Sequence, residues 1–314
     1  MKRKVIKQGN GTLTITLPKE WTKKSNLKGG DEIDVIEKDK SLVVGGHKDD
    51  SVKEIKIDVS NLDRTTLQIL IQSIYRYGYD LIEVISHNPM IAHHRLGKKV
   101  STSSVIYDST NRLVGAEVIS ASSKRYVIKR IAEESINDFP TILRRIFRLL
   151  NEMIDSFIQS VKTNDNEMIK SIEFQHINLK KFINFCLRLL NRYGYEDSRK
   201  TCFYFNIISL LSKVEDIIKN NSRYTLKHKI KIQKKKTFEL LEDIKDHIRM
   251  FYELFFNYKL EKIAELNKQR DIFREKLFKY TKDMSKEENL VIGGLSQIVE
   301  LILDMTETRM ALES

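Results

Sequence analysis

Apolar and polar residues alternate one by one near the start of the chain, over residues 12–17. Leu13, Ile15 and Leu17 alternate with threonines, and this period of two is typical of a strand with one buried face. Pro18 ends the strand, because proline has no N–H to give to a ladder. The segments predicted here are a strand over 12–17, a short helix over 19–27 and two strands over 32–37 and 41–44.

Segments with the strand period of two and segments with the helical period of 3.6 both occur between residues 47 and 131, which predicts a small α+β middle domain. One helix of this segment has a stripe of Leu67, Leu70, Ile71 and Ile74 at helical spacing. The predicted elements are strands over 54–59, 79–86, 105–107, 113–120 and 126–131 and helices over 62–76 and 88–98.

From residue 132 to residue 314 the apolar period is 3.6 throughout, as in Ile142, Ile146 and Leu149. The predicted helices cover about 133–161, 165–192, 198–221, 226–257, 259–282 and 285–312. Long antiparallel helices with short links favour two three-helix bundles, about 133–221 and 226–312.

The predicted fold class is therefore multidomain, and 314 residues allow two or three domains. No apolar run approaches the roughly eighteen residues of a membrane span, and the charged N-terminus lacks an apolar signal core. We expect a cytoplasmic protein without stable membrane insertion. Cys186 and Cys202 stand apart from any metal-type pattern and are predicted to be buried helical cysteines rather than a disulfide. The predicted domains are 1–46, 47–131 and 132–314.

Charge adds a candidate function to this architecture. The net charge is +12, and between residues 2 and 28 eight basic residues face one acid, Glu20. One sign of charge on so short a segment favours a polyanion such as DNA. The candidate DNA-binding residues are Lys2, Arg3, Lys4, Lys7, Lys19, Lys23 and Lys24.

The same segment resembles the AbrB/SpoVT swapped-hairpin DNA-binding domain that MazE antitoxins also contain. The residues that carry the resemblance are Gly9–Asn10, LTITLPKEW, Asn26–Leu27, Gly29–Gly30–Asp31 and the closing LVV. The resemblance implies a β-barrel built by two chains. About forty residues bury too little apolar surface alone, which favours a dimer as well. A hairpin module that only dimerises is the alternative.

Two of the predicted helices share a faint sequence repeat. Residues 211–220 parallel residues 295–304, so that Asp216 matches Glu300 and Asn220 matches Asp304. Each pair has a spacing of four residues, which places two oxygen-bearing side chains on one helical face. Such a face is suited either to a cation or to solvent.

The helical region resembles the PhoU phosphate-uptake regulators, especially the archaeal type with an AbrB-like N-terminus. The resemblance is carried by Glu134-Ser135-Ile136, Phe139-Pro140, Leu143-Arg144-Arg145-Ile146-Phe147, Met153, FCLRLLNRYGYED (185–197) and IVELILDMTETRMAL (298–312). It implies iron, zinc or manganese on an acidic motif, with Asp216, Glu300 and Asp304 as ligands. This chain departs from the motif, because in one register Ser212 and Ser296 replace the first carboxylate.

Two further features have a functional and an ordinary interpretation. His87, His93 and His94 are close in sequence, but adjacent residues diverge on a helix, so we expect loop or surface histidines rather than metal ligands. The lysine-rich run 227–236 at the start of the fourth predicted helix suits DNA, an anionic lipid or an acidic partner. A solvated helix end is the ordinary interpretation.

No phosphate-binding loop, nucleophile elbow or HExxH motif occurs, which favours a regulator over an enzyme. The predicted function is a DNA-binding, transcriptional regulator of phosphate uptake and homeostasis, a homodimer whose bundles receive the signal. The resemblance implies phosphate ABC-transporter components or a phosphate sensor as partners. The alternative is a PhoU-like interaction protein that docks there without binding DNA. An antitoxin is less favoured, since antitoxins of this type usually end in a short tail and not in a long helical region. A metal-dependent enzyme built on the acidic helices is also less favoured.

Overall fold

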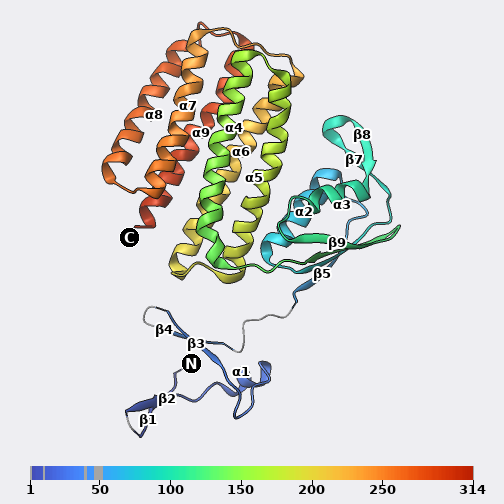
Figure 1. The fold of residues 1–314 in the computed structure, drawn as a ribbon, viewed down its shortest axis with the longest axis vertical. Helices are drawn as coiled ribbons and strands as arrows, with labels where there is room; N and C mark the ends of the chain where they lie inside the picture. The colour runs from blue at the N-terminus through green and yellow to red at the C-terminus, as the bar shows by residue number, and fades with distance from the viewer. Residues whose placement is uncertain (1, 10, 39–40, 46–51, 314) are drawn as a thin grey trace. The chain divides into compact units, whose positions relative to one another are not determined.

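A computed structural model describes residues 2–9, 11–38, 41–45 and 52–313 (Figure 1). The chain divides into two compact units, Met1–Val52 and Lys53–Ser314. Each unit is described by itself below.

The first unit contains two short antiparallel hairpins and one helix. In the first hairpin Lys7 pairs with Leu13, and in the second Val35 pairs with Val44. The elements are β1 (Ile6–Gln8), β2 (Thr12–Thr14), α1 (Lys19–Lys24), β3 (Asp34–Lys38) and β4 (Ser41–Gly45). The predicted strand over 12–17 ends at Thr14, because β1 offers only three residues for pairing. The helix after Pro18 and the two later strands are confirmed to within a few residues.

The middle part of the second unit is a four-stranded sheet with the strand order β5-β6-β10-β9. Strand β5 is parallel to β6, and β10 is antiparallel to both β6 and β9. Helices α2 and α3 lie on one face of this sheet (Figure 1). The elements are β5 (Glu54–Asp58), α2 (Arg64–Tyr77), β6 (Leu81–Ile85), β7 (Met90–His93), η1 (His94–Leu96), β8 (Lys98–Ser101), α3 (Thr102–Thr110), β9 (Ala116–Ala121) and β10 (Arg125–Arg130).

Two sequence predictions in this part were wrong. The predicted helix over 88–98 is the hairpin β7–β8, in which Ile91 and His93 are buried and their neighbours are not. Gly97, with φ of +61°, supplies the left-handed residue of the turn. The predicted strand over 105–107 lies inside α3, where Val105, Ile106 and Ser109 are buried at helical spacing. Short apolar runs do not separate strand from helix, which explains both errors.

The six predicted long helices are confirmed, with shifted boundaries. They are α4 (Phe139–Thr163), α5 (Asn166–Tyr193), α6 (Thr201–Lys227), α7 (Lys235–Phe256), α8 (Leu260–Tyr280) and α9 (Lys286–Ala311). The first helix starts at Phe139 rather than 133. The fourth starts at Lys235 rather than 226, because Ile230 and Ile232 are buried in a non-helical linker. The lysine-rich run is therefore mostly linker and not a helix end.

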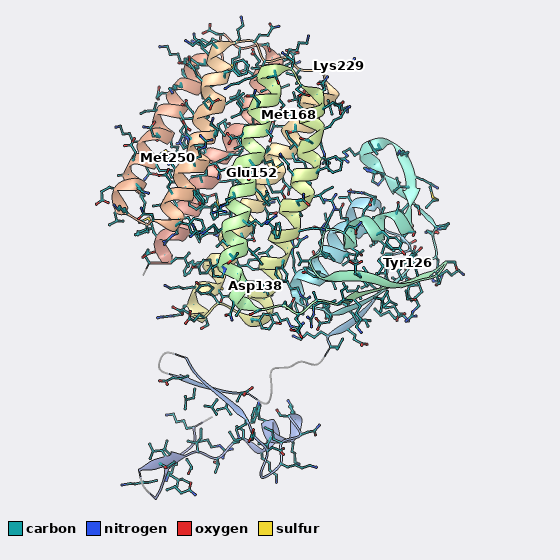
Figure 2. All side chains as sticks on the ribbon, viewed as in Figure 1. Tyr126, Asp138, Glu152, Met168, Lys229 and Met250 are labelled. Carbon is teal, nitrogen blue, oxygen red and sulfur yellow. The ribbon has the colours of Figure 1, made fainter. Side chains whose placement is uncertain are left out.

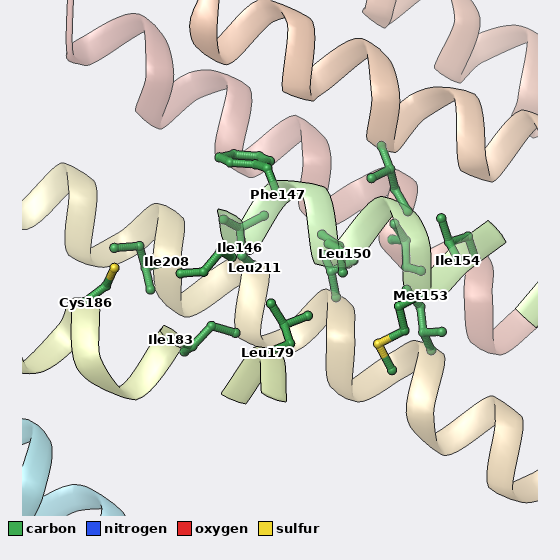
Figure 3. Close-up of a cluster of buried hydrophobic side chains, with 14 of the residues drawn as sticks. Ile146, Phe147, Leu150, Met153, Ile154, Leu179, Ile183, Cys186, Ile208 and Leu211 are labelled. Carbon is green, nitrogen blue, oxygen red and sulfur yellow. The ribbon is translucent and has the colours of Figure 1, made fainter. Parts of the chain in front are cut away.

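Helices α4, α5 and α6 pack together, as do α7, α8 and α9, and the α6–α9 and α4–α7 contacts join the two groups. Side chains fill the space between these helices (Figure 2). Figure 3 shows the centre of the first group, where Ile146 and Leu150 of α4 meet Leu179 and Ile183 of α5 and Leu211 of α6. The apolar surfaces of both groups form one continuous core.

The repeat seen in the sequence lies at the α6–α9 contact. Leu211 and Leu295 are both buried at matching positions of the two helices. Within the described ranges, α9 is also the one helix long and apolar enough to cross a membrane, contrary to our expectation of no such run. It packs against α6 and α7, as a core helix does.

The middle part is fixed to the helices through α5, against which α2 packs. The fully buried Arg188 of α5 donates from Nη2 to Oδ1 of Asp80 (2.6 Å) and from Nε to Oε2 of Glu134 (2.8 Å). It also donates to the backbone carbonyl of Tyr79 at 2.7 Å. A fully desolvated guanidinium is tolerable only with such partners, so this joint holds α2 and α5 in a defined relation.

Candidate functional site

The candidate DNA-binding residues all lie on the surface of the first unit. Lys7 is on β1 and three lysines are on α1, and the seven predicted side chains are exposed. Among the residues that the structure describes, none of the seven forms a salt bridge with a carboxylate. They are Lys2, Arg3, Lys4, Lys7, Lys19, Lys23 and Lys24. Cations without internal partners remain available to an external polyanion.

The first unit also exposes apolar side chains that the sequence pattern assigns to a core. Leu13 is 65% exposed and Ile15 is 50% exposed. In the described part of this unit no side chain is buried. The other large exposed apolar side chains described in this unit are Val5, Ile6, Val35, Leu42 and Val52. Apolar area left open on so small a unit is a surface for association with another chain.

The predicted acidic face on α6 is neutralised by lysines. Asp216 accepts from Lys180 of α5 at 3.1 Å and from Lys219 one turn further along α6. Burial opposes ionisation of this carboxyl, but the two ammonium groups lower its pKa to about 2. Asn220, its predicted companion, is exposed.

The matching face on α9 is neutralised as well. Glu300 accepts from Nε of Arg274 of α8 at 2.9 Å, whereas Asp304 is exposed to solvent. In this arrangement Asp216 and Glu300 each have an internal cation, which leaves a poor donor set for a metal ion. Metal binding by these residues is an implication of the resemblance to PhoU regulators alone.

Sequence reasoning missed a buried cluster beside Asp216. Glu215 is fully buried, forms an ion pair with Lys180 and accepts a hydrogen bond from Nδ1 of His176. A ligand atom each of His176, Glu215 and Asp216 lies within 4.8 Å of the others, a spacing that suits a cation. Here the Lys180 ammonium fills that role. Burial lowers the pKa of His176, although Glu215 opposes this effect.

This cluster lies at one wall of a cavity of about 600 Å³. The cavity is lined by residues of α2 and β7 on one side and of α5 and α6 on the other. Its cations come from distant parts of the sequence, so local sequence patterns do not reveal that they lie together. One signal was present: His176, Lys180, Asn184 and Arg188 recur every four residues on α5, and all four are buried. A polar row at that spacing marks a helix face that meets polar partners rather than solvent.

The three histidines of the middle part differ from our expectation in one case. His87 and His94 are exposed, as expected. His93 is buried and lines the cavity, because it occupies an inward position of β7 rather than a helix surface. Of the two cysteines, Cys186 is buried as expected and Cys202 is exposed, and neither forms a disulfide.

Comparison with known proteins identifies the first unit. Residues 6–50 match the family described as "Antidote-toxin recognition MazE, bacterial antitoxin". The N-terminal segment is a MazE-like domain. The resemblance based on its alternating strand and glycine turns is thereby confirmed. The family covers only this MazE-like domain and not the remaining, larger part of the chain.

The crystal structure of the phosphate transport system regulatory protein PhoU from Streptococcus pneumoniae is similar to 57% of this chain and 94% of its own chain. The two share 15% sequence identity, with a TM-score of 0.43. Among curated proteins, none matches this chain in sequence.

Proposed function

We propose that this protein is a cytoplasmic, DNA-binding regulator of phosphate uptake and cellular phosphate homeostasis that acts on transcription. The observation that carries the proposal is the surface of the MazE-like domain. Seven cations are exposed there over residues 2–24, and none of them forms a salt bridge with a carboxylate of the described residues. Lysine and arginine contacts to phosphates supply most of the affinity of such a surface for DNA.

The proposal includes a homodimer through the MazE-like domain. Leu13 and Ile15 are at least half exposed in the single chain, although their alternation is that of a buried strand face. A second copy supplies the same apolar face, so each copy buries the apolar surface that the other leaves exposed. Two copies also double the number of cations along one DNA duplex, which strengthens binding.

The helical region is proposed to receive the phosphate signal. The support is the resemblance of residues 134–147, 185–197 and 298–312 to PhoU regulators. By that resemblance the partners are phosphate ABC-transporter components or a phosphate sensor. The role is regulatory rather than enzymatic, and the bundle conformation controls the DNA-bound state.

Genome-wide DNA occupancy of the full chain, measured with and without phosphate, tests the proposal. We expect occupied promoters near phosphate-transport genes, and a change in occupancy on phosphate addition. Specific recovery of transporter components without any occupied site would support the alternative, a docking protein in which the N-terminal domain only dimerises.

A further inference from the structure

The cavity beside α5 has an unusual concentration of positive charge. The middle part contributes four arginines to its lining, namely Arg64, Arg76, Arg95 and Arg112. The helices α5 and α6 contribute Lys180, Lys213, Lys219 and Arg223. The lining includes one carboxylate, that of Asp216. The cavity therefore lies between two cationic walls, each from a different part of the chain.

Nearby carboxylates do not neutralise this charge. Glu215 pairs with Lys180, and Glu173 pairs with Arg223 at an Oε2–Nε distance of 2.8 Å. Two further acids are Asp216 and Asp108, whose charge attracts Arg112. Four acids therefore face the eight cations of the lining. Arg64, Arg95 and Lys213 have no salt-bridge partner within the described ranges of the chain.

The guanidinium groups around the cavity repel one another. Burial lowers the pKa of Arg112 and repulsion from Arg64 lowers it further, and these effects outweigh the opposing charges of Glu173 and Asp108. The pKa of Arg95 is likewise lowered by burial and then by repulsion from Arg223 and Arg64, which together outweigh the opposing charge of Glu173. Like charges from α2, η1 and α6 are thus held close together at a cost in stability, which a bound anion would offset.

The rest of the lining is suited to a compact polar ligand. Thr65, Gln68 and Ser73 of α2 and Ser209 and Ser212 of α6 add hydroxyl and amide groups, and the apolar contributions are Ile69 and Leu187. No phenylalanine, tyrosine or tryptophan is among the described lining residues, and the two lining histidines, His93 and His176, are buried, so little ring surface is open for a nucleobase to stack on. His93 is 7% exposed, and its Nδ1 has no hydrogen-bond partner among the described residues.

We propose that this cavity binds a small anion that carries several phosphate groups and no nucleobase, with triphosphate as the simplest case. Guanidinium groups match phosphate oxygens in pairs, and a volume of about 600 Å³ is in the range of small-molecule sites. Binding at this site does not depend on the proposed function, but the role of the ligand as the phosphate signal rests on it. Because both walls supply cations, the ligand bridges the middle part and α5–α6.

Titration calorimetry of the full-length protein tests this site with triphosphate, orthophosphate, sulfate and ATP. We expect one triphosphate per chain, bound at least tenfold more tightly than orthophosphate or sulfate. The variant Arg64→Gln/Arg95→Gln should weaken triphosphate binding at least tenfold. Without ligand it should melt no lower than the wild type, because the substitution relieves charge repulsion and breaks no described salt bridge.

The matched control is Lys279→Gln/Lys282→Gln, which removes the same charge from exposed residues at the end of α8. It should bind triphosphate like the wild type. Absence of triphosphate binding, or equal weakening in the control, would overturn the proposal. ATP bound more tightly than triphosphate, or duplex DNA that displaces triphosphate, would overturn it too.

Charge reversal at Arg3 and Lys7 separates this site from the proposed DNA-binding function. That variant should keep wild-type triphosphate binding even where DNA binding is lost. Loss of triphosphate binding in this variant would contradict a site located wholly in the second unit. A wild-type protein that binds triphosphate but no DNA would refute the proposed function alone.

Discussion

Arg188 of α5 and Asp80 at the start of β6 form a buried ion pair, with Nη2 and Oδ1 2.6 Å apart. Arg192 and Arg130 also donate to the same carboxylate oxygen, at 2.6 Å and 2.7 Å. One carboxylate thus holds three guanidinium groups where the sheet, α5 and the segment leading to α4 meet. The relation between α2 and α5, and with it the cavity between them, depends on this pair.

Asp80→Asn should therefore destabilise the second unit strongly. The change leaves the buried Arg188 without its closest charged partner, and breaking a buried pair typically costs about 3–5 kcal/mol. Urea unfolding of the full chain measures the free energy. Asp155→Asn is the control, because its pair with Arg249 is largely exposed and worth about 0–1 kcal/mol. An equal decrease in the free energy of unfolding in the two variants would show that the buried pair stabilises the protein no more than the exposed pair does.

The same pair predicts how stability depends on pH. Burial opposes ionisation of Asp80, but hydrogen bonds from Arg192 and Arg130 lower its pKa from 3.8 to about 2 in the folded protein. A lowered pKa means that the unfolded chain takes up the proton first as pH falls. The stabilisation is full above about pH 4 and is lost as pH falls towards 2.

Unfolding of wild type and Asp80→Asn should be compared between pH 5 and pH 2. We expect the difference in melting temperature to shrink as pH falls over this window. A difference that persists at pH 2 would assign the effect of the substitution to packing instead of charge.

The sequence predicted the long helices well, because their apolar stripes repeat over many turns. Short segments carried too little pattern: Met90 to His93 and Val105 to Tyr107 were each assigned the wrong element. The cavity could not be predicted from local patterns, because Arg64, Arg112 and Arg223 are brought together only by the packing of α3 on α2, of α2 on α5 and of α5 on α6. Pairing of Lys180 with Glu215 depends on the same packing.

DNA binding by the MazE-like domain should depend steeply on salt. With roughly four to eight phosphate contacts per dimer, log K against log salt should fall with a slope near −4 to −7. Charge reversal at Arg3 and Lys7 should weaken binding and reduce the slope. Fluorescence anisotropy of labelled duplex DNA with the full chain measures both. Lys279→Glu/Lys282→Glu is the control for net charge, and a loss of affinity as large as that of the N-terminal variant would refute the assignment.

Dimer formation should depend on one face of β2. Leu13→Asp puts a carboxylate on the apolar face that we assign to the second copy, where an unpaired charge is strongly unfavourable. Thr12→Asp is the matched control, because alternate residues of a strand point to opposite faces. Light scattering of the full chain should show a monomer for the first variant and a dimer for the second. Dissociation of both, or of neither, would mean that this face is not the interface.

Elemental analysis of the purified full chain tests the metal prediction for Asp216, Glu300 and Asp304. Lys180, Lys219 and Arg274 already neutralise two of these carboxylates, so we expect only trace iron, zinc or manganese. Glu300→Gln/Asp304→Asn should leave that content unchanged and shift the free energy of unfolding by no more than about 0.5 kcal/mol, as is usual for surface positions. Amide for carboxylate is nearly isosteric, so helicity should be preserved. A stoichiometric metal that disappears in this variant would establish α9 as a metal site and would require Arg274 to release Glu300.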